Sequence, residues 1–581
     1  MFRKGTRQRG RAQLAEALVL VLAAAWVSHV AQYAKSQTIN GEVLLQMEQR
    51  LLQVATMSHV LYGFYILCFL AILSSLYRPQ ASHSLRMSCR NKHDSGLAVG
   101  CLLPPLVLLS RLLAEIYQVG SFSSFTCFYA WVSISIGFSA LLKFVVFRSM
   151  TSLQINLLVD VVLLPIVFGV LSPTEASQRF LLATGARIAV AIVLAAGLTL
   201  LPRSFTIGEA VLVAQGIGLC AFDLVLVTTH RMRKQQLLQS VPKLFQAWFI
   251  FEIDRPKSVL ALEVGMLGSL LVCVASISLL QSNGVSSPTK IAQPLSFHKS
   301  MQFILLATVV VGGVVYPWSC LLLQTWNPFA WLLDFLTEPS ISGVMLVPPR
   351  LALIVYWISC LIILVPIVAF ASKHFKLRNI VTRKYFHFLV VLMLGPPSFF
   401  DAPMLSLSYG VALSVFIIVE CVRAMSLPPF GRSIASFMKS FIDSREAGRV
   451  ILTHSYLLIG CALPLWLVPP PNPPSPLVMN AGVVALGIGD AMGAVVGSSV
   501  GKRMVFGTKT VEGSVAVFIS IMIASGLLQN HRGIIGADYV QVVKLTCAVF
   551  LTTILEAATA QIDNLVLPLF FYSVCNLVEC I

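Results

Sequence analysis

The sequence predicts an all-α polytopic integral membrane protein with about 14–16 transmembrane helices. Of the 581 residues, 57% are hydrophobic and 11% are charged, whereas a soluble chain carries about 25% charged residues. Apolar runs of about 20 residues, the length that a helix needs to cross the hydrocarbon core, recur along the chain. No run alternates in the manner of a strand, so helices are the expected way to satisfy the backbone in lipid.

The net charge of +17 does not indicate a nucleic-acid-binding protein. The Lys and Arg residues stand in short loops between apolar runs, which is the distribution that sets membrane orientation. Thirteen cysteines are scattered, mostly inside apolar runs and without a CxxC pair. We therefore expect buried, inert thiols rather than a zinc site or a disulfide framework.

The chain begins with MFRKGTRQRGRAQ and an apolar run from Leu14 to Ala34, the charge order of a signal peptide. The run is long for a signal peptide, and Trp26, His29 and Gln32 spoil a small-residue cleavage site, so a retained first span is expected.

Residues 1–370 form a multi-span membrane region whose role the sequence does not assign. The clearest spans there are Val54–Leu76, Phe125–Phe147, Leu153–Leu171, Ile207–Val227, Val259–Leu280 and Met301–Leu323. A few charged residues fall within or near these apolar runs: Glu115, Asp160, Arg187, Asp223 and Glu263. Charged groups at membrane depth are often functional, but no motif surrounds these, and a role in helix packing or at span ends is the alternative.

Residues 371–581 show a sharper pattern of alternating loops. Stretches 373–384, 423–449 and 502–509 together carry 13 Lys and Arg residues, whereas the intervening loops carry only Arg532. Orientation follows this bias in short loops, so the three basic stretches are expected to face the cytoplasm.

Polar chemistry is concentrated between Leu486 and Ser514, where LGIGDAMGAVVGSSVGKR leads into a short loop. Gly493, Gly497 and Gly501 recur every four residues and share one helical face, with Asp490 close to it. The glycines are typical of a helix-packing seam. Alternatively, the missing side chains admit a phosphate chain or a metal beside Asp490, whose charge a packing seam does not need. We expect Gly487 and Gly489 to break the helix, giving a re-entrant segment that lines a wet cavity.

The loop FGTKTVEGS has the composition of a phosphate cradle. Gly507 and Gly513 free the backbone to turn N–H groups toward an anion, and Lys509 supplies a point charge. Hydroxyl donors would come from Thr508, Thr510 and Ser514, and Glu512 would hold a metal or pair with Lys509. The alternative is an ordinary basic loop that caps the next helix. GSSVGKR has the wrong spacing for a Walker loop, and the protein-kinase motifs are absent.

Two further stretches carry candidate site residues. AQIDN places Asp563 and Asn564 just before the last apolar run, with Glu556 one to two turns earlier. A second carboxylate there suits a Mg²⁺-bridged triphosphate, whereas a helix cap is the alternative. In RKYFHF, interfacial anchoring and substrate or phosphate contacts are equally good interpretations of Arg383, Lys384 and His387.

Taken jointly, RKYFH, GIGDAMGAVVGSSVGKR, GTKTVEGS and AQIDNLVLP resemble the membrane-embedded CTP-dependent lipid kinases of dolichol and phytol. The similarity covers about 200 residues, from Ser372 to Ile581. The stretch ILTHSYLLIGCALPLW and the long N-terminal half are most similar to the dolichol kinases of that family. Val511 and Gly493 depart from the common pattern, but neither change removes a charge or a hydroxyl.

The resemblance implies transfer of the γ-phosphate of CTP to the terminal hydroxyl of dolichol, giving dolichyl phosphate for protein glycosylation. It implies a site on the cytoplasmic side of the endoplasmic reticulum membrane and a divalent metal such as Mg²⁺. Asp490, Lys509 and Glu512 would be catalytic, and Asp490 and Asp563 would hold the metal, although Asp490 could instead be the base. The CTP-binding residues would be Gly501, Lys502, Arg503, Gly507, Thr508, Lys509, Thr510, Glu512, Gly513 and Ser514.

Other functions remain open at the level of sequence. A phosphatidate cytidylyltransferase-like enzyme would use a similar CTP site but release pyrophosphate rather than CDP. A phytol or polyprenol kinase would differ only in the alcohol. A transporter would explain the many spans, but the inverted repeats typical of transporters are not apparent.

Overall fold

The computed structural model describes residues 2–39, 45–76, 89–90, 96–119, 123–145, 176–235, 255–280, 297–339, 348–375, 379–438, 450–467, 475–506, 509–530 and 539–580. The regular elements in these ranges are helices, which confirms the all-α fold class. Twelve of them are long and apolar enough to cross a membrane, which confirms a polytopic membrane protein. Of the other expected spans, Leu153–Leu171 lies outside the described residues, and three shorter helices of 14–17 residues account for others.

The N-terminal helices largely follow the expected apolar runs. They are α1 (Phe2–Ile39), α2 (Leu45–Leu76), α4 (Leu97–Ala114), η1 (Glu115–Val119), α5 (Ser124–Val145), α8 (Ala176–Leu200), α9 (Ile207–Lys234), α10 (Lys257–Leu280), α11 (Phe297–Val310), η4 (Val311–Val315), α12 (Tyr316–Leu323), α13 (Pro328–Thr337) and the first part of α14 (Pro349–His374). The η elements are π-helical turns that continue a neighbouring α-helix.

The C-terminal helices are shorter on average. They are α15 (Asn379–Leu394), α16 (Pro397–Phe400), α17 (Ala402–Ala424), α18 (Gly431–Met438), α19 (Thr453–Trp466), α20 (Pro476–Met479), η6 (Val483–Asp490), α21 (Ala491–Ser499), α22 (Val511–Asn530), α23 (Tyr539–Ala558) and α24 (Asp563–Glu579). The short α15, α19 and α24 are the three helices that fall below the usual spanning length.

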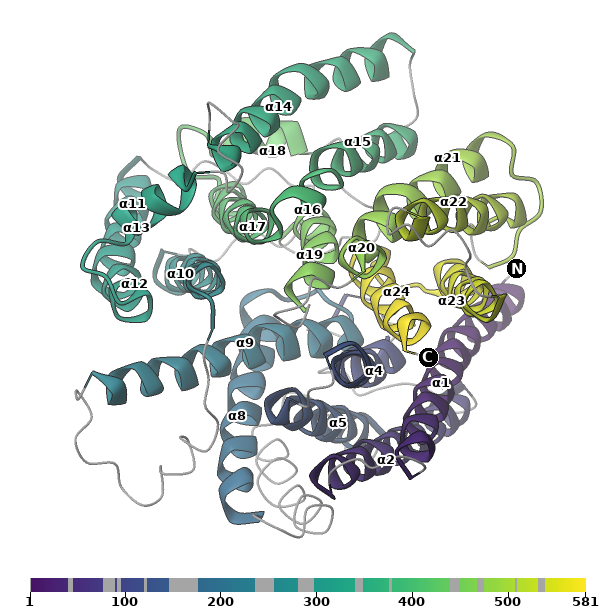
Figure 1. Ribbon diagram of the computed structural model, residues 1–581. Coiled ribbons are helices and arrows are strands. Elements are labelled where there is room, and N and C mark those ends of the chain that lie inside the picture. Colours follow the sequence, from purple (N-terminus) through teal and green to yellow (C-terminus); the bar gives the residue numbers. More distant parts are fainter. Residues whose placement is uncertain are drawn as a thin grey trace.

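The bundle is built around α24. This helix contacts α4 on one side and α19, α23 and η6 on the others, and Figure 1 shows it near the middle of the molecule. Every residue from Asn564 to Val578 is buried, as expected for a helix that is apolar on all faces. The last helix of the chain is therefore its central one.

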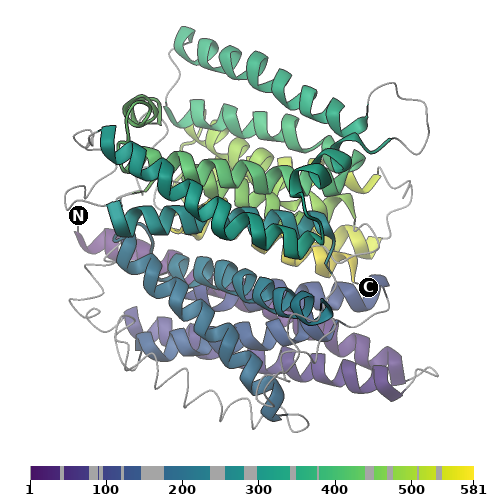
Figure 2. The same cartoon turned by 90° about the vertical axis from the view of Figure 1, so that its left-hand side faces the viewer.

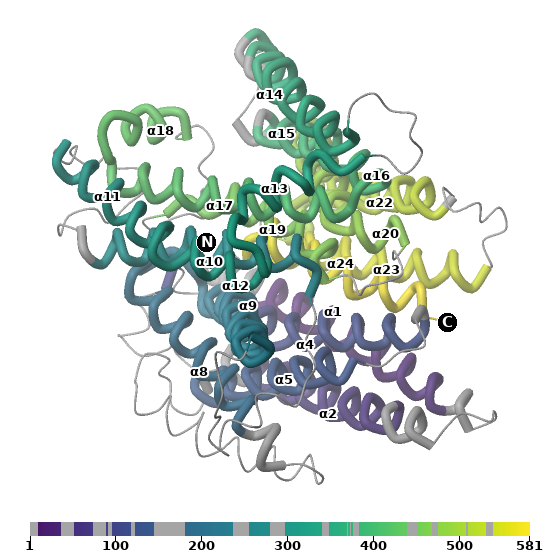
Figure 3. The backbone as a smooth tube through the Cα atoms, turned by 60° about the vertical axis from the view of Figure 1, so that its left-hand side comes forward, coloured from purple at the N-terminus to yellow at the C-terminus, as the bar shows by residue number. Residues whose placement is uncertain are grey.

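The hydrophobic core is continuous across position 370. One cluster of buried side chains joins α1, α2, α4, α5 and α9 to α19, η6, α22, α23 and α24. In Figure 2 the purple and blue helices lie below the green and yellow ones and run in similar directions, so the two regions stack along their lengths. At the periphery, α11–α12 and α14 have almost no buried residues, and Figure 3 shows α14 at an outer edge, which suits a lipid-facing position.

Two of the acids noted within the N-terminal spans, Glu115 and Asp223, are paired with arginines. Arg111 Nε lies 3.1 Å from Glu115 Oε1, and Arg255 lies 3.2 Å from Asp223, which also accepts a hydrogen bond from Tyr129. These pairs support the packing interpretation of the intramembrane charges. Asp160 lies outside the described residues.

Candidate functional site

Five elements bring six ionisable side chains together at one end of the bundle. Lys384 and His387 come from α15, Asp490 ends η6, Lys509 precedes α22, Glu556 lies near the end of α23, and Asp563 begins α24. We refer to these six residues as the charged cluster. Because α15, α22 and α24 begin here while η6 and α23 end here, residues up to 179 positions apart in sequence converge. Asp490, Lys509 and Asp563 were expected in one site, and the structure brings them together.

Asp490 is the buried half of an ion pair. Its side chain is 2% exposed, and Oδ2 accepts a hydrogen bond from Lys384 Nζ. His387 Nε2 lies 3.8 Å from the same oxygen. His387 Nδ1 is 2.9 Å from the carbonyl oxygen of Arg383, and because that oxygen can only accept, Nδ1 carries a proton. The RKYFH stretch therefore supplies two direct neighbours of Asp490.

The segment that delivers Asp490 is not broken, contrary to expectation. Residues Val483–Asp490 form a π-helix that continues directly into α21. Gly487 and Gly489 face neighbouring helices instead: a Cβ at Gly489 would lie 2.7 Å from the side chain of Ile521. Wide π turns often occur at functional sites inside helices, and here the wider turn places Asp490 against α15 without exposing the backbone.

The glycine stripe serves helix packing. A Cβ at Gly497 would lie 3.0 Å from Thr510 Oγ1, and one at Gly513 would lie 2.8 Å from the carbonyl oxygen of Gly493. The missing side chains thus let α21 approach the start of α22. Of the two interpretations of the stripe, the structure supports the packing seam.

The loop between α21 and α22 is a tight hairpin. Val505 N–H donates to Lys509 O, and Val511 N–H donates to Arg503 O, around a Met504–Thr510 bridge. Thr510 caps α22, since its Oγ1 accepts from Gly513 N–H at 3.2 Å. The helix-capping alternative is therefore realised at Thr510. Gly507 and Thr508 lie outside the described residues.

Glu512 turns back onto the start of the hairpin. Its carboxylate accepts the backbone N–H groups of Lys502, at 3.1 Å, and Arg503, at 3.3 Å. The expected pairing of Glu512 with Lys509 is therefore wrong, because these N–H groups hold the carboxylate away from the charged cluster. The side chains of Lys502 and Arg503 are exposed, so they remain accessible to an anion.

Lys509 points into the charged cluster. Its Nζ forms an ion pair with Glu556 and lies 3.7 Å from Asp563 Oδ2. Burial acts to lower the pKa of Lys509, but the carboxylates of Glu556, Asp563 and Asp490 raise it above its ordinary value. The ammonium group is therefore charged throughout the physiological pH range.

The remaining predicted residues occupy different positions. Asn564 is buried, and its Nδ2 donates to the carbonyl oxygen of Thr453 at 3.1 Å, so it connects α24 to α19. Ser514 Oγ is buried without a hydrogen-bond partner among the described residues. Gly501 packs against Thr510.

Glu556 is the cluster member that sequence reasoning noted only as a neighbour of AQIDN. It lies in α23 and is 3% exposed. The available signal was a lone acid one turn before the end of an apolar run, followed closely by a second acid at Asp563. Its pairing with Lys509, 47 positions earlier, depends on how α22 and α23 pack.

The carboxylates of the charged cluster suit a metal ion only when another ligand is also present. Within the described part of the chain, no three His, Cys, Asp or Glu side chains converge on one ion position, and the cluster carboxylates are neutralised by lysines. Mg²⁺ is commonly held by one or two carboxylates together with substrate phosphates. Asp490 and Asp563 therefore suit a magnesium–nucleotide complex rather than a metal cage made by protein alone.

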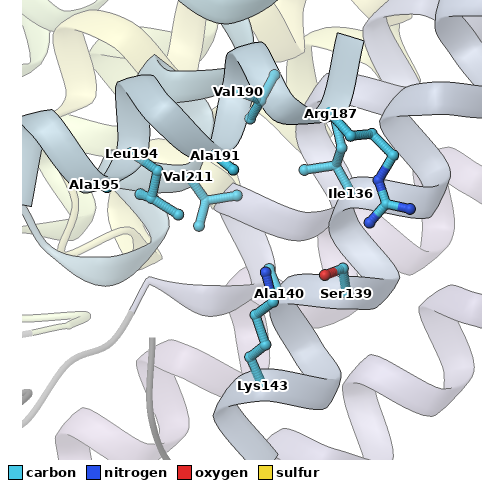
Figure 4. Close-up of a pocket in the computed structure, with 10 residues that line it drawn as sticks. All are labelled: Ile136, Ser139, Ala140, Lys143, Arg187, Val190, Ala191, Leu194, Ala195 and Val211. Carbon is cyan, nitrogen blue, oxygen red and sulfur yellow. The ribbon is translucent and has the colours of Figure 1, made fainter. Parts of the chain in front are cut away.

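A separate cavity of about 40 Å³ lies in the N-terminal region between α5, α8 and α9. Figure 4 shows Lys143, Arg187 and Ser139 among its lining residues. Small-molecule pockets usually enclose about 300–1,000 Å³, so this cavity is of the size that holds water rather than a nucleotide.

Comparisons with known proteins agree with the motifs. A family model described as dolichol kinase matches residues 188–458, ending before Asp490. A dolichol kinase of Mus musculus is 34% identical over 389 residues, covering 64% of this chain and 65% of the mouse protein. The Arabidopsis thaliana protein "Dolichol kinase EVAN" is 31% identical over 379 residues, covering 64% of each chain.

A dolichol kinase of Saccharomyces cerevisiae is 27% identical over 246 residues, covering 42% of this chain and 44% of the yeast protein. The chain thus spans slightly less than two thirds of the length of the curated relatives that it matches. No solved structure matches it. By the family model and by the shared identity with animal and plant proteins, this chain is similar to the dolichol kinases.

Proposed function

We propose that this chain is a CTP-dependent dolichol kinase of the endoplasmic reticulum membrane, with its active site facing the cytoplasm. It would transfer the γ-phosphate of CTP to dolichol, giving dolichyl phosphate and CDP. The observation that carries this proposal is the charged cluster, which lies beside the basic hairpin of residues 501–511 at one end of an apolar bundle. Residues 371–581 would hold the chemistry, and residues 1–370 would support it.

The triphosphate would lie on the hairpin side of the cluster. Lys502 and Arg503 are exposed there and would attract the anion, while Lys509 would neutralise charge on the phosphates. Phosphoryl transfer depends mainly on positioning and charge neutralisation. Gly501, Gly513, Thr510 and Glu512 would act by shaping the hairpin, since their contacts lie within it and with the adjoining helices α21 and α22. Gly507, Thr508 and Ser514 complete the proposed CTP site.

The reacting alcohol would enter from the apolar side. The dolichol oxygen attacks the γ-phosphorus while the bond from that phosphorus to the β–γ bridging oxygen breaks, and CDP leaves. The hydroxyl proton passes to Asp490, which ends the apolar helix η6 and is buried. Lys384, His387 and Arg383 would orient Asp490, and Asn564 would hold the start of α24 against α19.

A bound Mg²⁺ would neutralise charge that builds up on the transferring phosphate. Asp563 would hold it through the nucleotide, and Asp490 would be the second ligand in the alternative in which it is not the base. In the described structure both carboxylates face lysines. When the nucleotide binds, its phosphates would replace the carboxylates as partners of these lysines.

The decisive test is a membrane assay with γ-labelled CTP or ATP and dolichol, scored for label in the lipid. Label from CTP alone, with CDP as the nucleotide product, is the expected result. Label from ATP would retain a lipid kinase but reject CTP as the donor. Pyrophosphate and a CDP-lipid would indicate a cytidylyltransferase, and no product at all would reject the proposal.

The roles of the two aspartates can be separated kinetically. Asp490→Asn should lower kcat by about 10²–10⁴-fold at saturating Mg²⁺, the range for loss of a general base. Asp563→Asn should instead raise the Mg²⁺ concentration needed for half-maximal activity. Both variants should insert into the membrane at wild-type levels, and retained turnover in Asp490→Asn would remove that residue from the mechanism.

A further inference from the structure

The turn that precedes Asp563 is held by the N-terminal region. Ile562 N–H donates to Glu209 Oε1 at 2.9 Å, and Thr206 Oγ1 donates to Gln561 Oε1 at 2.5 Å. These bonds join residues separated by 353 and 355 positions in the sequence. Two consecutive residues of the C-terminal turn are thus hydrogen-bonded to the first turn of α9.

Both carboxylate oxygens of Glu209 accept hydrogen bonds. The residue is completely buried, and both of its oxygens accept from Arg90 NH2, at 2.6 and 2.8 Å. It also accepts Thr206 N–H at 3.1 Å, while its own N–H donates to Thr206 Oγ1, so it forms half of a capping box. A buried carboxylate with this many donors is fixed in orientation, and its bond to Ile562 transmits that orientation to the turn.

The surrounding backbone leaves the turn little room to move. Gly96 has a φ of +59°, and a Cβ there would collide with the side-chain amide of Gln561. A Cβ at Gly208 would collide with the carbonyl group of Gly96. The starts of α4 and α9 therefore pack directly against each other and against the turn.

Asp563 is the first residue of α24, and Ile562 is its N-cap. We propose that Glu209 is a positioning residue, which fixes Ile562 so that the Asp563 carboxylate faces Lys509 in the charged cluster. This inference rests on the proposed kinase function, and it gives the N-terminal region a direct part in the site. Glu209 itself touches neither Lys509 nor Asp563 through any described contact, so its effect passes through the turn.

The first measurement needs no activity. Hydrogen exchange of residues 559–565 should be faster in Glu209→Gln than in the wild-type protein, because the substituted amide loses the charge that binds Arg90. Asp401→Asn is the matched control. Asp401 also pairs with an arginine, Arg350 at 2.7 Å, and also caps a helix by accepting Met404 N–H, but it lies beyond the far end of α15. It should leave exchange at residues 559–565 unchanged.

The second measurement is a double-mutant cycle between Glu209→Gln and Asp563→Asn, read as kcat and as the Mg²⁺ requirement. Glu209→Gln should raise the Mg²⁺ requirement as Asp563→Asn does, but to a smaller extent. The expected loss of activity is about tenfold, as for other residues that orient metal ligands. In the Asp563→Asn background it should have no further effect, whereas a merely destabilising change would multiply in both backgrounds. If turnover of Asp563→Asn is too low, the rise in Tm produced by MgCTP replaces kcat.

Each outcome bears on a different claim. Unchanged exchange at residues 559–565, or independent effects of the two substitutions, would overturn the positioning role of Glu209. Faster exchange without any CTP-dependent kinase activity in the wild-type protein would retain the hydrogen-bonded turn and reject the proposed function. If Glu209→Gln does not accumulate, Thr206→Val, which removes only the hydroxyl bond to Gln561 and the cap, should give the same signature in milder form, and its absence would count against the proposal.

Discussion

Lys384 and Lys509 each neutralise a buried carboxylate that belongs to another helix. Lys384 pairs with Asp490, and Lys509 pairs with Glu556 beside Asp563. Removing one partner of a buried pair leaves an uncompensated charge, which costs more stability than the pair contributed. A simple alanine substitution at Lys509 would therefore mix loss of nucleotide binding with loss of folding.

Pairing the substitutions separates the two effects. Lys509→Met should lower the amount of folded protein and raise the KM for CTP. Lys509→Met combined with Glu556→Gln should restore folded protein, because the Glu556 carboxylate no longer remains as an unpaired buried charge, while the KM stays raised. Thermal unfolding and steady-state kinetics of the purified protein provide the check, with Lys257→Met, at an exposed lysine that starts α10, as the control. An unchanged KM in the double variant would remove Lys509 from the nucleotide site.

At the scale of elements, the contact between α21 and α22 sets the position of the hairpin. The glycine stripe on α21 faces Thr510 and Gly513, so the hairpin is anchored at the seam between the two helices. The π-helical turn of η6 then places Asp490 at the other end of the same helical segment. The packing seam thus carries the hairpin on which the proposed CTP site would lie.

Two glycines of α22 test this dependence. Gly513→Ala should destabilise the protein by about 1–3 kcal/mol, the usual cost of overpacking, and should weaken CTP binding, because the new Cβ would press on the carbonyl of Gly493. Gly526→Ala lies on the same helix in open space and should be neutral or stabilising by about 0.5–1 kcal/mol. Tm and CTP binding of the two variants are compared directly, and equal effects would contradict the seam.

At the scale of the whole molecule, the helix that begins with Asp563 is also the centre of the core. Because α24 packs on α4 as well as on α19, α23 and η6, the site end of the bundle is built from both halves of the chain. The convergence of α15, α22 and α24 at this end agrees with the basic stretches lying on one side of the membrane.

Cysteine labelling in sealed microsomes tests that orientation. Arg432→Cys, in a basic stretch, should react with a membrane-impermeant maleimide without detergent. Arg532→Cys, in a loop that the charge bias predicts to lie on the opposite side, should react only after the membrane is opened. The wild-type protein, which has an exposed Cys547, sets the background, and the reverse pattern would place the proposed active site in the lumen.

The fold class and most members of the charged cluster were accessible from the sequence, whereas the orientation stays a prediction. Apolar length and charge placement are local properties, and alternating basic loops require that Lys384, Lys509 and Asp563 return to one end. The ion-pair partner of each charged side chain could not be predicted from the sequence in the same way. Glu512 was expected to hold a metal or to pair with Lys509, but it binds backbone N–H groups that the hairpin brings within reach.

Hydropathy and charge act residue by residue, so the sequence specifies the set of groups and predicts the side of the membrane on which they gather. Only the tertiary structure decided that Lys509 meets Glu556, that an intact π-helical turn carries Asp490, and that Glu209 holds the turn before Asp563. Those contacts join helices distant in sequence, and their geometry follows from how close-packed helices fit together.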